Sequence, residues 1–271
     1  PQIEPEVENW ASYPMTAARR LARDFGPGLE GGRLVFASNL PPASGMSSSS
    51  AFITGTVLSL ADRNGLTDGG SWRDTFPDRE TLADYLGAVE NGRPFGRLEG
   101  DKGVGTHGGS EDHTAMLCSL PDYLVRYAYA PVRMEARLPM PLDMVFAIAS
   151  SGVPARKTGS ARERYNEAAD RMAMLLEIWN RSDDVAAPNI GTVLEEDPGA
   201  EEQLLEAIQL HAPAGLQTAL RDRLEHFRAE QTEILSTATE ALEQEDMETF
   251  GRTVGRSMNL AEDLLANQVP E

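Results

Sequence analysis

The sequence predicts an α/β (α+β) protein whose N-terminal half, to about residue 155, contains a sheet and whose remainder is mainly helical. The first observation is a set of strand-like segments separated by proline turns: Tyr123–Tyr129, Val132–Leu138 and Asp143–Ala149. The second is the helical spacing of apolar residues from Pro198 onward. After Ala149, the remaining strand signal is a weak one near Ile190–Leu194.

Apolar residues recur at helical spacing in the other elements that we expect. In the N-terminal half these helices are Tyr13–Phe25, Phe52–Ala61 and Glu80–Glu90. In the C-terminal half they are Tyr165–Trp179, Ala200–Leu210, Leu216–Glu243 and Asp246–Asn267. The apolar run Arg33–Ala37 is predicted to be a strand that leads into a loop of small residues.

Composition excludes several classes of partner. The formal net charge of −19 argues against nucleic acid and anionic membranes, because their phosphates would be repelled. A single cysteine, Cys118, excludes an intramolecular disulfide and fits a cytoplasmic location. No apolar run approaches the roughly 20 residues that span a bilayer. The oligomeric state is left open.

The most informative stretch is LPPASGMSSSSA at Leu40–Ala51, between the predicted strand and the helix Phe52–Ala61. Gly45 allows close approach of the backbone, and Ser47–Ser50 place hydroxyls and free amide groups at a helix start. The helix dipole adds about half a positive charge there, so the pattern predicts an anion site. The alternative is an ordinary serine N-cap preceded by a flexible loop.

A second informative stretch is GVGTHGGSEDHTAMLC at Gly103–Cys118. Ser110 is predicted to cap a helix that carries Glu111 and Asp112 in its first turn. Capping alone does not require the preceding glycines, so the loop is expected to be either mobile or closely approached.

The serine loop resembles the second motif of the GHMP kinases, most closely in its galactokinase form, and it lacks the GK[ST] of a Walker P-loop. The resemblance implies a two-domain fold: a mixed-sheet nucleotide-binding domain over 1–155 and a mainly helical domain over 156–271. It also implies that the loop binds ATP through Ala43, Ser44, Gly45, Met46, Ser47, Ser48, Ser49 and Ser50. Ser49 is expected to hold Mg²⁺, with Glu90 as a second ligand. For Glu90 a solvated surface carboxylate is the alternative.

The segment GGSEDH resembles the galactokinase pattern of glycine, two residues, aspartate and glutamine. The resemblance implies that Asp112 faces the sugar hydroxyl as catalytic base and that Gly109 contacts the sugar. His113 stands where the family has glutamine. His107 and His113 are competing candidates for the base. A zinc site made of His107, Glu111 and His113 is a further rival, although it lacks a fourth ligand nearby.

Two aromatic residues complete the expected site. Trp10, in WASY, matches a Trp-x-x-Tyr stretch that precedes the phosphate loop in galactokinases. It is expected either to form a wall for the nucleotide base or to pack in the core. Tyr165, in RYN, is matched to a tyrosine that binds sugar at a helix start.

The resemblance implies ATP- and Mg²⁺-dependent phosphorylation of a sugar hydroxyl, with the anomeric hydroxyl of galactose or a related sugar expected. One alternative is an inactive galactokinase-like sensor of sugar and ATP, and another is a family member that acts on a non-sugar alcohol. The family's first and third motifs do not occur in this sequence. We therefore expect a piece of a longer kinase, without the first strands of its N-terminal domain and with a truncated C-terminal domain.

Overall fold

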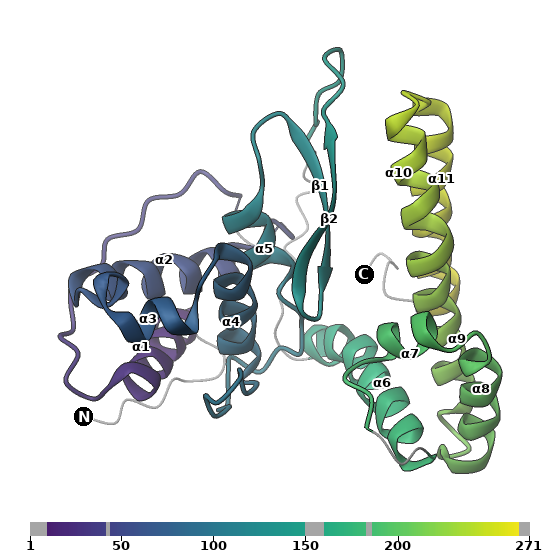
Figure 1. Ribbon diagram of the computed structural model, residues 1–271, viewed down its shortest axis with the longest axis horizontal. Helices are drawn as coiled ribbons and strands as arrows, with labels where there is room; N and C mark the ends of the chain where they lie inside the picture. The colour runs from purple at the N-terminus through teal and green to yellow at the C-terminus, as the bar shows by residue number, and fades with distance from the viewer. Residues whose placement is uncertain (1–9, 42–43, 150–159, 183–185, 266–271) are drawn as a thin grey trace. The chain divides into compact units, whose positions relative to one another are not determined.

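The computed structural model describes residues 10–41, 44–149, 160–182 and 186–265 (Figure 1). The chain divides into two compact units, residues 1–162 and 163–271. Each is described by itself below. The predicted extents of the two functional domains stay a prediction.

The first unit is built around three helices, α1 (Ser12–Phe25), α2 (Ser48–Arg63) and α4 (Arg79–Asn91). A short 3₁₀ turn, Leu66–Asp68, and α3 (Gly70–Thr75) connect α2 to α4. The three predicted helices are confirmed, with α1 and α4 each beginning one residue earlier than expected. They contact one another pairwise, and α5 (Glu111–Cys118) packs on α2 and α4 (Figure 1).

The core of this unit lies between α1, α2 and α4. Leu21, Ile53 and Val57 are fully buried there, as are Leu86 and Val89 from the apolar face of α4. At one end the core is aromatic: Phe25, Trp72, Phe76, Tyr85 and Phe95 lie with ring centroids 4.7 to 6.5 Å apart. Such ring pairs add packing energy beyond the burial of their area.

The sheet of the described residues is a two-stranded antiparallel hairpin, β1 (Tyr123–Tyr129) and β2 (Val132–Pro139). Leu124 pairs with Leu138, and the register shifts between Arg126 and Tyr127. These strands were predicted almost to the residue. In the described part of the chain, this antiparallel hairpin takes the place of the mixed sheet that was predicted.

Two other strand predictions are wrong. Arg33–Ala37 and Asp143–Ala149 form no ladder in the structure. Their apolar side chains are largely in solvent, with Val35 89% and Val145 87% exposed. A strand needs hydrogen-bond partners as well as strand-like composition, and these two segments have no neighbouring strand among the described residues.

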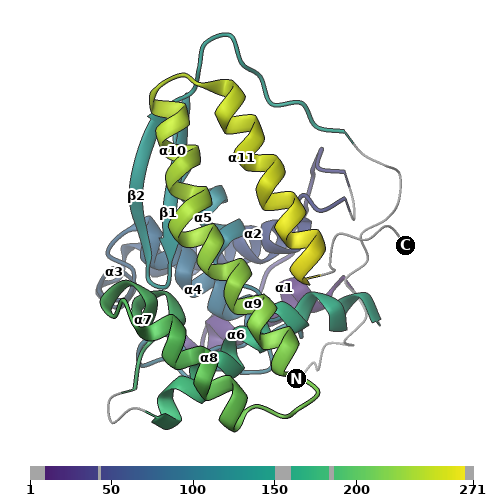
Figure 2. The ribbon, with the colours of Figure 1, turned by 90° about the vertical axis from the view of Figure 1, so that its right-hand side faces the viewer.

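The second unit is helical, as predicted: α6 (Ser160–Ser182), α7 (Ile190–Glu196) and α8 (Ala200–His211) precede a long hairpin (Figure 2). The long helix of the hairpin consists of α9 (Gln217–Ala229), a π-helical turn Glu230–Ile234 and α10 (Leu235–Glu243). It is followed by α11 (Met247–Leu260) and a π-helical turn Ala261–Leu265. The weak strand signal near Ile190–Leu194 is wrong, because Asn189 caps a helix there by accepting from Thr192 N at 2.8 Å.

His226, on α9, is explained as a packing residue of this unit. Burial and the neighbouring Arg223 lower the pKa of its imidazole. The neutral ring can then accept a hydrogen bond at Nδ1 from the Arg223 guanidinium, 3.1 Å away. Leu220 and Leu224 of the same helix are buried in the core of the unit.

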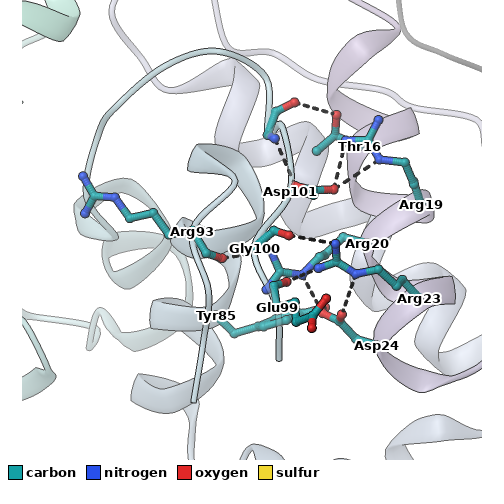
Figure 3. A network of polar contacts seen from close by, with 11 residues as sticks. Thr16, Arg19, Arg20, Arg23, Asp24, Tyr85, Arg93, Glu99, Gly100 and Asp101 are labelled. Carbon is teal, nitrogen blue, oxygen red and sulfur yellow. Dashed lines mark hydrogen bonds and ion pairs between the residues drawn. The ribbon is translucent and has the colours of Figure 1, made fainter. Parts of the chain in front are cut away.

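A buried ion pair lies within α1, and its arginine also bonds to the loop that follows α4 (Figure 3). Arg20 is fully buried, and its Nε donates to Asp24 at 2.6 Å while its Nη1 donates to the carbonyl of Arg93 at 2.9 Å. The Tyr85 hydroxyl donates to the same Asp24 carboxylate at 3.1 Å. Burial and the charge of Asp24 raise the pKa of Tyr85, so the phenol stays neutral and remains a donor.

Replacing Arg20 by alanine is expected to lower the free energy of unfolding by about 3–5 kcal/mol, because the Asp24 charge would stay buried without its partner. The control is Arg73→Ala, which breaks the exposed pair with Asp68 and should cost less than about 1 kcal/mol. Urea unfolding followed by circular dichroism measures both. A loss below 1 kcal/mol in Arg20→Ala would contradict a structural role for the buried pair.

Candidate functional site

The site begins at the N-terminal end of α2, which starts at Ser48 directly after the serine loop. Ser47 has a left-handed backbone, with φ of 54°, and its side chain does not cap the helix. A non-glycine residue in this conformation costs on the order of 1 kcal/mol, so other contacts must hold the loop in place. The first turn therefore has amide groups that Ser47 does not satisfy and that can face an anion.

Ser50 brings three segments together. Its hydroxyl lies 2.8 Å from Glu90 Oε2, at the end of α4, and 3.2 Å from Asp112 Oδ2, in the first turn of α5. Ser50 and Glu90 are 1% and 7% exposed, whereas Asp112 is half-buried. The two stretches singled out in the sequence thus meet at one point in the structure.

His113 lies on the inner side of this cluster and is 1% exposed. Its Nε2 is 3.2 Å from Glu90 Oε2, at ion-pair distance but without the alignment of a hydrogen bond. Its buried position makes it a poor candidate for a base that reaches a substrate. Asp112 is the more accessible of the two side chains.

The donor set of this cluster fits a hard cation. The Ser50 hydroxyl can donate its proton to only one of the two carboxylates at a time. An oxygen of the other carboxylate then lies close to the Ser50 oxygen with no hydrogen bond between them. Mg²⁺ prefers such oxygen ligands and takes few of them from the protein, with water and substrate phosphates completing its shell. Ser50 and Glu90 could supply such oxygens. The resemblance implied Ser49 as the metal-side serine, and this stays a prediction; the serine that bonds to Glu90 is Ser50.

The glycine-rich loop returns to the C-terminal end of α4. Val104 N donates to the carbonyl of Glu90, and Asp101 N donates to the carbonyl of Gly92, both at 2.8 Å. Gly92 and Gly103 have positive φ, and a Cβ on either would lie 2.4 or 2.5 Å from a backbone oxygen. Close backbone packing requires both glycines, and at Gly103 it agrees with the closely approached loop that was one of the two expectations.

Aromatic side chains flank the start of α2. The rings of Trp10 and Phe36 lie 5.8 and 4.9 Å from that of Phe52, centroid to centroid. Trp10 is 64% exposed, so it is not a core residue. Its exposed face remains available to a planar ligand.

The other predicted residues are only partly described. Ala43 lies outside the described residues. Tyr165 lies in α6, in the second unit, and its side chain is outside the described part of the structure. Gly109 is exposed, next to the Tyr129 ring. Ser110 begins α5 without a side-chain cap bond, and its hydroxyl lies 3.4 Å from the Tyr129 carbonyl instead, which corrects the predicted capping role.

The zinc alternative finds no support in the structure. His107 is exposed and His113 is buried. Among the described residues, no three His, Cys, Asp or Glu side chains gather in a way that could hold a metal ion.

No described helix is long and apolar enough to cross a membrane.

Sequence reasoning missed two features of this site. One is the proximity of Ser50 to both carboxylates, which depends on where the helix turns and not on the composition of the loop. The other is Asn91, next to Glu90, which contacts the loop before Asp112. The dipeptide Asn91-Gly92 was a signal for a helix end, but it gave no indication of this contact.

Comparisons with known proteins match part of the chain that contains the N-terminal end of α2 and Glu90. Residues 12–96 match the family model described as GHMP kinases N terminal domain. A galactokinase from Candida maltosa is 35% identical over 71 residues, which make up 25% of this chain and 33% of that protein. The match thus spans about a third of the length of this curated relative. Over the matched part, the chain is thus similar to the N-terminal domain of the GHMP kinases and to a galactokinase.

Proposed function

We propose that the protein is a kinase that transfers phosphate from ATP to a hydroxyl of galactose or a related sugar. The observation that carries the proposal is the position of Ser50 between Glu90 and Asp112 at the N-terminal end of α2. A helix start that can bind phosphates therefore carries a serine, Ser50, that lies within hydrogen-bond distance of two carboxylates. This is the arrangement that phosphoryl transfer to an alcohol needs.

Each residue has a distinct role in this proposal. The backbone amides and hydroxyls of Ser47, Ser48 and Ser49 bind the phosphates of ATP at the positive end of the helix dipole. Ser50 and Glu90 hold Mg²⁺, which supplies charge neutralisation on the phosphates when bound. The exposed face of Trp10 stacks on the nucleotide base.

Asp112 is the proposed catalytic base. A sugar hydroxyl is a poor nucleophile, and a carboxylate that accepts its proton speeds the attack by about 10²–10⁴-fold. Asp112 is half-buried and lies at the start of α5, beside the exposed Gly109. A sugar that contacts Gly109 would present its hydroxyl to this carboxylate.

Replacing Asp112 by asparagine is expected to lower turnover by about 10²–10⁴-fold, because the amide has the same shape but cannot accept the proton. The affinity for ATP should change less than about twofold. Release of ADP by the complete protein, measured across a panel of sugars with galactose first, tests turnover. Equilibrium dialysis tests nucleotide binding.

Glu111→Gln is the matched control for Asp112→Asn, since it removes the same charge from the neighbouring, exposed position. It should retain turnover within about twofold. Equal losses in both variants would point to the summed charge at the helix start and would contradict a specific role for Asp112. Binding of sugar and ATP without ADP release in the unmodified protein would instead indicate a sensor.

Ser50→Ala and Ser49→Ala compare the two serines as metal-side residues. Ser50→Ala should raise the Mg²⁺ concentration for half-maximal activity by about tenfold, because it removes an oxygen beside Glu90. Ser49→Ala should change it by less than about threefold. A titration of ADP release against Mg²⁺ at fixed ATP measures both values, and the reverse order of effects would restore Ser49 to the metal-side position.

A further inference from the structure

The side chain of Asn91, in the last turn of α4, is attached to the loop that precedes Asp112. Its Oδ1 accepts a hydrogen bond from Gly108 N at 2.6 Å. Its Nδ2 donates to the carbonyl of Gly87, one helical turn back, at 2.6 Å and lies 3.4 Å from the carbonyl of Gly109. One amide therefore contacts both the helix and two consecutive residues of the loop.

Gly87 allows the loop to lie this close to the helix. A Cβ at this position would lie 2.8 Å from Ser110 Cα and 3.2 Å from the carbonyl of Gly109. Real Cβ atoms essentially never come so near to a backbone atom. The loop thus rests directly on the α4 backbone, and Asn91 fixes its position along the helix.

The loop position determines where Asp112 lies. The carbonyl of Ser110 accepts bonds from Thr114 N and Thr114 Oγ1, both at 2.8 Å, so the start of α5 is rigidly joined to the loop. Asp112 is two residues after Ser110. A shift of Gly108 and Gly109 along α4 would therefore move the Asp112 carboxylate relative to Ser50 and Glu90.

We propose that Asn91 is a positioning residue that holds the Gly108–Ser110 loop on α4 and thereby places Asp112 and Gly109 for the acceptor substrate. The kinetic part of this inference rests on the proposed kinase function, whereas the structural part does not. Asn91 acts through the loop and does not contact the reacting groups.

The chain contains a matched control for Asn91. Asn64, at the C-terminal end of α2, also donates from Nδ2 to the carbonyl one turn back, Leu60 O, at 2.8 Å. It also contacts a neighbouring loop residue, accepting from Glu30 N at 2.7 Å and donating to Glu30 O at 3.1 Å. Asn64 thus makes the same kinds of bond at another helix end, without contact to the loop before Asp112.

Hydrogen–deuterium exchange of the complete protein tests the structural part without requiring activity. In Asn91→Ala, the Gly108 amide should exchange at least about tenfold faster, because its acceptor is gone. In Asn64→Ala, the Glu30 amide should exchange faster while Gly108 stays unchanged. Unchanged exchange at Gly108 in Asn91→Ala would overturn the inference.

Kinetics test the functional part. Asn91→Ala should lower kcat/KM for galactose, or for the best sugar of the panel, by about tenfold, since small displacements of a reacting group cost rate steeply. The KM for ATP should change less than about twofold, because the bonds described for Asn91 go to α4 and to the loop before Asp112. Asn64→Ala should leave both values unchanged.

Asn91→Asp is the conservative variant that separates positioning from stability. It retains an oxygen to accept from Gly108 N but loses the donor to Gly87 and Gly109. Slow exchange at Gly108 and a partial return of kcat/KM in this variant would support positioning. Losses that follow the melting temperature alone, in all three variants, would overturn it.

The two proposals fail in different ways. If the unmodified protein phosphorylates no sugar but Gly108 exchanges faster in Asn91→Ala, the kinase assignment fails and the attachment of the loop stands. If the unmodified protein is active and Asn91→Ala affects the KM values for sugar and ATP equally, the kinase assignment stands and the positioning role fails.

Discussion

Close packing of backbone on backbone at the C-terminal end of α4 is the constraint on which the candidate site depends. The backbone of the loop folds back closely on itself at Gly92, Gly100 and Gly103. A Cβ on any of these glycines would lie 2.4 or 2.5 Å from a backbone atom of the loop or of the helix end. This contact brings the loop back to the carbonyls of the helix end. Glu90, the buried carboxylate of the site, therefore lies in the same helical turn as Asn91, which bonds to the loop before Asp112.

Arginines of α1 bond to residues 99–101 of the same loop (Figure 3). Arg23 donates to the carbonyls of Glu99 and Gly100, and Arg19 pairs with Asp101 at 3.0 Å. Apolar side chains could fill this space, but they could not satisfy the backbone oxygens of a glycine-rich loop. The buried charge of Arg20, with its cost of desolvation, is thereby explained as a means of fixing irregular backbone against a helix.

Local pattern was sufficient for the longer helices and the hairpin, because apolar spacing and proline turns are properties of short segments, but it missed the short helices α3 and α7. It was insufficient for Asp143–Ala149, whose composition favours a strand but whose state depends on a partner strand. It was also insufficient for choosing between Ser49 and Ser50. Successive helical residues point about 100° apart, so only the observed start of α2 at Ser48 shows which serine faces Glu90.

The choice of a serine between two carboxylates has an electrostatic consequence. A lysine or arginine in place of Ser50 would cancel one of the two negative charges of Glu90 and Asp112 and would bring no oxygen for a cation. A hydroxyl lies within hydrogen-bond distance of both carboxylates but adds no charge, so the N-terminal end of α2 stays attractive to a divalent ion. The helix start a few residues earlier attracts an anion at the same time. Opposite preferences at such short range are what the proposed binding of a metal–polyphosphate complex requires.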